Sequence, residues 1–119
     1  SGGKPVAVTL KDYSVMASPD SVAAGEVTFT VKNDGSFVHE MLVIKADSPA
    51  ALPLKADGTV NEDALGEESI PGEASDINPG ATAKLTLKLS AGKYLLVCNR
   101  VDGTKRHYHE GMVTSFTVV

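Results

Sequence analysis

Hydrophobic and polar residues alternate with a period of two along much of the chain, and this pattern predicts β-strands with one buried face. The three clearest stretches each place three apolar residues on one face: Val6, Val8 and Leu10; Val27, Phe29 and Val31; and Leu85, Leu87 and Leu89. In the last stretch the intervening positions are lysine and threonine, as a solvent-facing side of a strand requires.

Three other runs are apolar at consecutive positions, which indicates central strands or strands covered on both faces. They are residues 40–45 (EMLVIK), 93–98 (KYLLVC) and 112–119 (MVTSFTVV). Turn-forming sequences such as NDGS, NPGA and SAGK separate the runs. The chain thus predicts an all-β fold of about seven or eight short strands, arranged as an antiparallel sandwich or barrel.

Residues 48–77 depart from the strand pattern and predict a long insertion between two strands, with a short helical turn near residues 61–65. Seven acids and no base lie between residues 57 and 76: Asp57, Glu62, Asp63, Glu67, Glu68, Glu73 and Asp76. A charged run of this kind is usually a solvated surface, and the alternative is a docking surface for a basic partner. No repeat or linker is visible, so we expect residues 1–119 to form a single domain.

The net charge of −4 argues against nucleic acid as a partner, because no basic face is available to neutralise phosphates. No apolar run approaches the roughly 20 residues of a membrane-spanning helix. The sequence begins SGGKPV and shows no signal peptide, so the compartment has to be inferred from the functional site.

One segment concentrates chemistry that packing does not require. Residues 97–113 (VCNRVDGTKRHYHEGMV) contain the single cysteine, two of the three histidines and one of the three methionines. One thiolate, two imidazoles and a weak thioether are the donors of a mononuclear copper site. Zinc usually takes more cysteines or a fourth strong ligand, and a cysteine nucleophile is usually activated at a helix N-terminus, which this segment lacks.

The strand pattern also indicates where these donors lie. Cys98 ends one expected strand, residues 99–106 form a loop, and His107 and Met112 precede the last strand. The remaining histidine, His39, follows a turn rich in Gly, Asn and Asp and begins an apolar strand. We therefore expect all four side chains at strand ends, with His39 supplied by a neighbouring strand.

Three motifs make the chain resemble the cupredoxin family, which includes plastocyanin, azurin, auracyanin and sulfocyanin. They are N-x-G-x-x-x-H over residues 33–39, G-K-Y-x-x-x-C over residues 92–98, and H-Y-x-x-G-M over residues 107–112. The resemblance extends from about residue 6 to residue 119, apart from the acidic insertion. It implies a Greek-key β-sandwich with one type 1 copper ion that transfers single electrons.

Carried over position by position, the resemblance implies four copper ligands: His39, Cys98, His107 and, as a weak axial ligand, Met112. It also implies that the backbone N–H of Glu40 points at the copper-bound sulfur, a contact that tunes such sites. The plain alternatives are a buried free thiol, ordinary histidines and a core methionine, which is the role we expect for Met16 and Met41.

The loop between Cys98 and His107 departs from the family pattern. Its eight residues exceed the number in plastocyanin-like members, so the site geometry could change or a further ligand could be recruited, with Asp102 and His109 as candidates. In an extended segment His107 and His109 point to opposite sides, so we expect His107 to face the metal and His109 to be exposed.

The leading functional hypothesis is a small electron carrier whose electrons leave through His107 to a redox protein met in a brief encounter. Arg100, Lys105 and Arg106 would form a basic rim for an acidic partner. The second hypothesis is copper transport or storage with the same ligands. We expect no enzymatic activity, no small-molecule substrate, a monomer, and a periplasmic or other extracytoplasmic location with a possible removed N-terminal membrane anchor.

Overall fold

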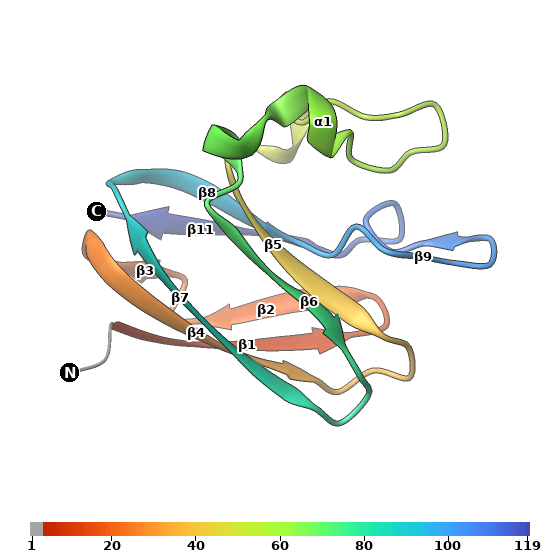
Figure 1. The fold of residues 1–119 in the computed structure, drawn as a ribbon, viewed down its shortest axis with the longest axis horizontal. Helices are drawn as coiled ribbons and strands as arrows, with labels where there is room; N and C mark the ends of the chain where they lie inside the picture. Colours follow the sequence, from red (N-terminus) through yellow and green to blue (C-terminus); the bar gives the residue numbers. More distant parts are fainter. Residues whose placement is uncertain (1–3) are drawn as a thin grey trace.

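Two β-sheets pack face to face in the computed structural model, which describes residues 4–119 (Figure 1). The first three residues, where the SGGKPV stretch begins, lie outside the described part. One sheet has the order β2-β1-β4-β7, with β1 at Lys4–Lys11, β2 at Ser14–Ser18, β4 at Gly25–Asn33 and β7 at Thr82–Leu89. The other has the order β3-β11-β8-β5-β6, with β3 at Ser21–Val22, β11 at Val113–Val118, β8 at Gly92–Val97, β5 at His39–Lys45 and β6 at Gly72–Ile77.

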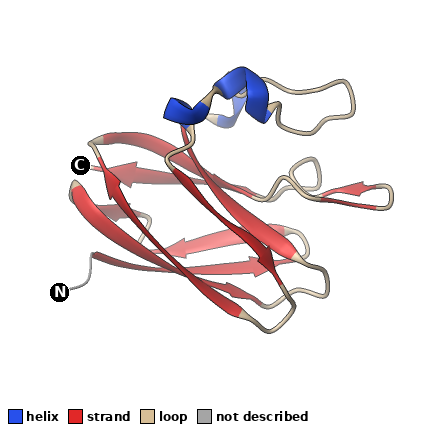
Figure 2. Ribbon diagram, in the orientation of Figure 1, coloured by secondary structure: helices blue, strands red, loops and turns tan. Residues whose placement is uncertain are grey.

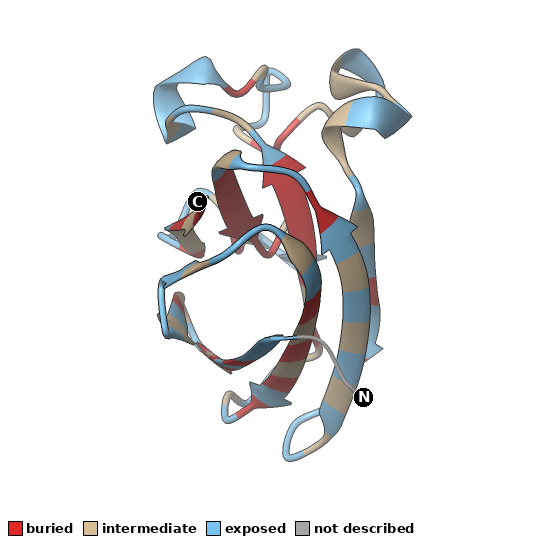
Figure 3. Ribbon diagram, turned by 90° about the vertical axis from the view of Figure 1, so that its left-hand side faces the viewer, coloured by how far each residue is buried: buried red, intermediate tan, exposed pale blue. Residues whose placement is uncertain are grey.

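The main core lies between the sheets, and Figure 3 shows buried residues in red on strands of both. The alternation predicted from the sequence is confirmed for β1 and β4, whose apolar faces are almost completely buried. On β7 the predicted face also points inward, although only Leu89 is fully buried and Leu85 and Leu87 are half-buried. The all-β prediction is therefore confirmed.

The expected antiparallel sandwich is corrected in one respect, because two strand pairs are parallel. β1 pairs with β4 in parallel, and β11 pairs with β3 in parallel. The parallel pairs arise because the chain leaves the first sheet after β2, crosses to the second sheet as β3, and returns as β4. Neither sheet of residues 4–119 closes into a barrel.

The strands predicted to be covered on both faces are β5 and β8, and both are buried throughout their apolar stretches. Their outer face is covered by Leu52 and Val60 of the insertion, which form a second core with the outward side chains of the two strands. The third apolar run, β11, meets the other form of the prediction, because it is a central strand between β3 and β8. Its Ser115 is exposed, so this strand is covered mainly on one side.

The insertion is shorter than predicted, because Gly72–Ile77 form the edge strand β6 beside β5. The predicted helical turn is confirmed as α1 (Glu62–Leu65), where the Asn61 side chain accepts the Ala64 N–H at 3.2 Å. Single 3₁₀ turns lie at Pro49–Ala51 and Glu67–Ser69. Figure 2 shows these helical segments together, above the strands, and none in residues 4–119 is long and apolar enough to span a membrane.

The prediction that Met16 and Met41 lie in the core is confirmed for only one of them. Met41 on β5 is fully buried, as predicted, whereas Met16 is 62% exposed and the prediction for it is wrong. The cause is the period of β2: Val15 faces the core, so its neighbour Met16 must face solvent.

Candidate metal centre

Asn33 shapes the turn that delivers His39 to the start of β5. Its fully buried side chain donates from Nδ2 to the carbonyls of Phe37 and Ile77, both at 2.8 Å, and its Oδ1 accepts the Gly35 N–H at 2.8 Å. These bonds satisfy the backbone groups of a turn that has no ladder partner. They explain physically why the motif before the histidine begins N-x-G.

Gly35 lies directly against the far edge of the His39 ring. A Cβ at this position would come within 2.7 Å of His39 Nε2 and would collide with the Asp12 carboxylate, so no larger residue fits without movement. Asp12 itself places Oδ1 2.6 Å from His39 Nε2, while its Oδ2 accepts the Ser36 N–H at 2.8 Å. A carboxylate on the outer nitrogen fixes the ring orientation and leaves Nδ1 free to bind a metal.

Asp12 was not identified from the sequence, because its contact with His39 depends on the parallel pairing of β1 with β4. That register places Leu10 opposite Asn33, and the hairpin after β1 therefore meets the turn before His39. Burial raises the pKa of Asp12, but the Ser36 N–H and the nearby His39 outweigh burial and leave this pKa below its ordinary value.

Cys98 follows β8 and points its fully buried thiol toward the start of β5. The backbone N–H of Glu40 donates to Cys98 Sγ at 3.4 Å, the contact that the family resemblance implied. This N–H is available because the β5–β6 register shifts between His39 and Met41, which takes Glu40 out of the ladder.

His107 is held by main-chain bonds within its loop. Its N–H donates to the Arg100 carbonyl at 2.9 Å, and its own carbonyl accepts the Met112 N–H at 3.1 Å. The preceding chain forms a small hairpin of β9 (Val101–Asp102) and β10 (Lys105–Arg106), which projects at the right of Figure 1. Asp102 Oδ2 lies 2.8 Å from His107 Nε2, at ion-pair distance but without the angle of a good hydrogen bond.

Three donor atoms from distant parts of the chain converge. His39 Nδ1 and His107 Nδ1 lie 3.0 Å apart, and Cys98 Sγ lies 3.7 Å from the first and 3.5 Å from the second. Bonds from imidazole and thiolate to an ion of zinc size are about 2.0–2.3 Å long, so two donors of one ion lie within about 4.5 Å. The separations therefore fit three ligands of one metal ion, and all three residues are fully buried.

Burial sets the proton affinities of this group. It raises the pKa of the Cys98 thiol to about 11, and it lowers the pKa of His107, with the nearby His39 adding to the effect. At neutral pH the thiol is therefore protonated when no metal is present, and metal binding must release that proton. Burial, followed by the charge of Glu62, also raises the pKa of Glu40 to about 7.

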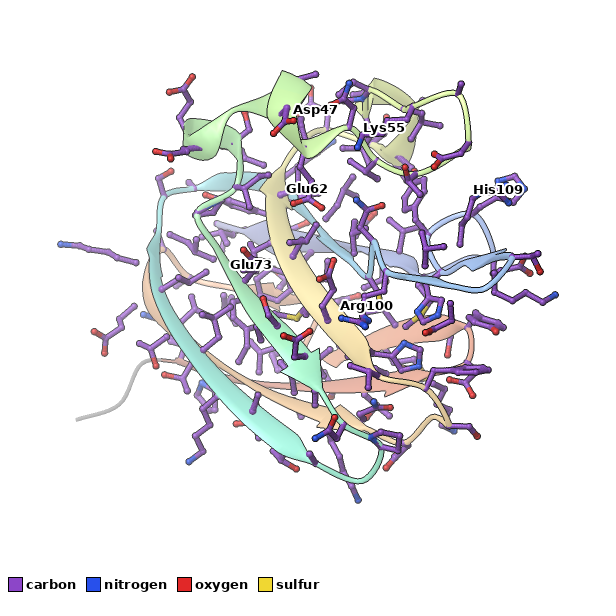
Figure 4. The ribbon with its side chains drawn as sticks, turned by 45° about the vertical axis from the view of Figure 1, so that its right-hand side comes forward. Asp47, Lys55, Glu62, Glu73, Arg100 and His109 are labelled. Carbon is purple, nitrogen blue, oxygen red and sulfur yellow. The ribbon has the colours of Figure 1, made fainter. Side chains whose placement is uncertain are left out.

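Main-chain hydrogen bonds join Met112 to both His107 and Cys98. Its N–H donates to the His107 carbonyl, and its carbonyl accepts the Cys98 N–H at 3.1 Å. It is fully buried. His109, in contrast, is exposed as predicted, and Figure 4 shows it at the far edge of the molecule. Neither His109 nor Asp102 joins the three converging donors among residues 4–119.

The expected electron exit through His107 does not open directly on solvent, because the His107 ring has no exposed area. The rings of Tyr13 and Phe37 lie over it, with centroids 5.2 and 6.1 Å from that of His107. The two cover rings stack at 6.3 Å, and Phe37 is 39% exposed. The expected basic rim also loses Arg100, which pairs with Asp76 at 2.7 Å.

Comparisons with known proteins identify the family and the fold. A family model described as the sulfocyanin (SoxE) domain matches residues 21–119. No curated protein matches the sequence significantly. The structure is similar to dithionite-reduced auracyanin from Roseiflexus castenholzii, with a TM-score of 0.70 and 17% identity over 100% of this chain and 99% of that chain.

Two further solved structures show the same fold. Auracyanin A, a "blue" copper protein from Chloroflexus aurantiacus, has a TM-score of 0.61 and 22% identity over 97% of this chain and 99% of its own. Rusticyanin from Thiobacillus ferrooxidans has a TM-score of 0.63 and 18% identity over 99% of this chain and 79% of its own. Because the family model spans most of the chain, the chain belongs to the sulfocyanin domain family, a cupredoxin family whose members carry one copper ion.

Proposed function

We propose that this protein is a mononuclear type 1 copper protein that shuttles single electrons between redox partners. The proposed ligands are His39, Cys98, His107 and, as the weak axial donor, Met112. The observation that carries the proposal is the convergence of two imidazole Nδ1 atoms and one thiol sulfur within 3.7 Å of one another in a fully buried site. A trigonal set of two imidazoles and one thiolate is the donor set of blue copper.

Copper held by His39, Cys98, His107 and Met112 would supply the one-electron chemistry, as the Cu(I)/Cu(II) couple. The chain holds the donors in one geometry for both states, which keeps the rearrangement during electron transfer small. Asp12 fixes the His39 ring, and the Glu40 N–H stabilises charge on the Cys98 sulfur. The burial of all three donors excludes water from the site.

The partner would meet the protein at the aromatic cover rather than at His107 itself. Tyr13 and Phe37 separate the His107 ring from solvent, so an electron leaving through this histidine crosses one of the two rings. The half-exposed Phe37 offers apolar contact, and Lys105 and Arg106 on the neighbouring hairpin favour a partner with carboxylates at its rim. Such an encounter is brief because the contact is small.

Copper transport or storage, the second hypothesis, receives no specific support. Handing copper to another protein needs donors that the acceptor can reach, and none of the three converging donors has exposed area. Cupredoxins typically carry electrons, and we propose neither an enzymatic activity nor a small-molecule substrate.

Residues 1–119 act as one domain, and the protein works as a monomer. Copper carriers of this family act outside the cytoplasm, so we place the protein in the periplasm or on the outer face of a membrane, where an N-terminal anchor would hold it.

The experiment is a visible absorption spectrum after addition of one equivalent of Cu(II). The wild-type protein should show an intense thiolate-to-copper band at about 600 nm, and Cys98→Ala should abolish it. The loop offers a matched pair of histidines: His107→Ala should remove or strongly alter the band, whereas His109→Ala should leave it unchanged. A wild-type protein with no intense band, or an equal loss in both histidine variants, would contradict the assignment.

A further inference from the structure

The insertion, which we define as residues 46–71, is packed against the sheet that carries the copper ligands. Its residues Leu52 and Val60 are 6% and 1% exposed and lie in one cluster with outward-facing side chains of β5 and β8. Figure 1 shows the insertion above these two strands. It is therefore a fixed part of the fold on which other segments can be anchored.

Asn99, the residue after Cys98, connects the copper loop to this insertion through its whole side chain. Its Oδ1 accepts the Val60 N–H at 2.8 Å, and its Nδ2 donates to the Val60 carbonyl at 3.0 Å and to Glu62 Oε2 at 2.8 Å. In Figure 4 Glu62 points down from the insertion toward β5. An amide that satisfies both backbone groups of one residue fixes two chain segments side by side.

Glu40 links the same residue to the ligand sulfur. The Asn99 N–H donates to Glu40 Oε2 at 3.2 Å, while the Glu40 N–H donates to Cys98 Sγ at 3.4 Å. Asn99, the first residue of the loop between Cys98 and His107, therefore connects this loop to the insertion and to the bulge after His39. We call Asn99 with Val60, Glu62 and Glu40 the Asn99 clasp.

The insertion also contacts the two residues that follow His107. A Cβ on Gly58 would lie 3.2 Å from His109 Nδ1, so the exposed His109 side chain lies over this glycine. Tyr108 packs against the second core that the insertion forms. The insertion therefore contacts the chain on both sides of His107. Tyr108 and His109 only pack against it, whereas Asn99, the neighbour of Cys98, is hydrogen-bonded to it.

We propose that Asn99 is a positioning residue for the copper site, and that the insertion is the frame on which it fastens the long loop. This inference rests on the proposed function. The eight-residue span between Cys98 and His107 gives the loop more freedom than a short one, and a long loop opens locally unless it is anchored. The clasp supplies that anchor at the point where the loop leaves β8.

The test compares Asn99→Ala with Asn61→Ala, a matched substitution one residue from Val60 and Glu62. Asn61 caps α1, so its substitution removes one hydrogen bond of the insertion and leaves the bonds of Asn99 to Val60 and Glu62 in place. In the metal-free protein, amide hydrogen exchange at His107 and Met112 should become about tenfold faster in Asn99→Ala, the equivalent of one lost net hydrogen bond. It should stay unchanged in Asn61→Ala.

The copper-loaded protein gives the second readout. Asn99→Ala should strengthen absorption at about 450 nm relative to that at about 600 nm, because a displaced thiolate changes the trigonal geometry. Asn61→Ala should keep the wild-type ratio even if its melting temperature falls as far. Unchanged exchange and an unchanged ratio in Asn99→Ala, or equal changes in both variants, would overturn the inference.

The two proposals fail in different ways. A wild-type protein with no intense band overturns the copper assignment. The exchange measurement on the metal-free protein then still decides whether Asn99 fastens the loop to the insertion.

Discussion

The two histidines of the site are supported in different ways. His39 begins a central strand, and its surroundings are a buried asparagine, a glycine without room for a side chain, and a carboxylate on its outer nitrogen. His107 lies on a loop held by its own main-chain bonds, a poorly angled contact with Asp102, and the Asn99 clasp at the start of the loop. One half of the site is built into the sheet, and the other is fastened onto it.

The difference shows how one end of a β-sandwich can join rigidity with a variable loop. The His39 half is set by packing between two sheets and tolerates little change. The His107 half is set by a few hydrogen bonds that reach from neighbouring segments, so it can lengthen if new anchors appear. Substitutions in the His39 half should therefore cost more than equivalent ones in the loop.

The largest effect is expected from Asn33→Ala. The substitution leaves the carbonyls of Phe37 and Ile77 and the Gly35 N–H without their partner. Unfolding in urea should show a loss of about 3 kcal/mol, since an unsatisfied buried group costs about 1–3 kcal/mol and the two part-buried groups add smaller losses. The exposed Asn78 provides the control, and Asn78→Ala should change stability by less than about 0.5 kcal/mol. A loss of stability below about 1 kcal/mol in Asn33→Ala would contradict the claim that the His39 half is the more rigid one.

Two glycines allow a direct comparison of the halves. Gly35→Ala forces a methyl group against His39 Nε2 and Asp12, so competitive titration should show copper affinity reduced by about tenfold or more. Gly103 lies in the loop half with φ +58 and nothing within 4 Å of an added Cβ. Gly103→Ala should cost only about 1 kcal/mol of stability from backbone strain, and leave copper affinity nearly unchanged. Similar losses of affinity in both variants would contradict the account.

Asp12 and Asp102, whose carboxylates lie against Nε2 of His39 and of His107, form the next pair. Asp12→Asn should lower copper affinity by about 10-fold to 100-fold, as is typical when the partner of a ligating histidine is changed. Asp102→Asn should lower it less, because Asp102 meets His107 at a poor angle and its side chain is 31% exposed. Stronger weakening by Asp102→Asn would reverse the assignment of the rigid and the fastened half.

The smallest effect concerns Glu40, at the junction of the halves. Its pKa is raised from 4.5 to about 7 by burial and by Glu62, so folding favours the protonated carboxyl. This contribution to stability is complete below pH 4.5 and is lost as pH rises through 7. In the metal-free protein Glu40→Gln should therefore gain stability over wild type between pH 5 and pH 9, on the order of 1 kcal/mol. A difference that does not vary with pH would argue against a raised pKa.

The sequence indicated the proposed ligands, but not the residues that hold the ligands in position. Period-two alternation found the inward faces of β1 and β4, and the clustering of Cys98, His107 and Met112 indicated a metal, because both signals are local in the chain. The sequence did not indicate Asp12, because its contact with His39 depends on the parallel register of β1 and β4. The sequence pattern does not specify that register.

The insertion shows the same limit. The acids were expected on a solvated surface, and six of the seven are exposed. The sequence did not indicate that Leu52 and Val60 of the same segment cover a second core. These two apolar residues are too widely spaced to form a pattern of their own. The continuous apolar runs of β5 and β8 were the available signal, since strands buried on both faces require something to cover the outer one.

The most direct test of the central claim is anomalous diffraction at the copper edge from crystals of the copper-loaded protein. The account predicts one copper peak within bonding distance of His39 Nδ1, His107 Nδ1 and Cys98 Sγ, with Met112 as the fourth and more distant neighbour. A peak at His109, a peak that lacks Cys98 among its neighbours, or the absence of a peak in these residues' surroundings would contradict it.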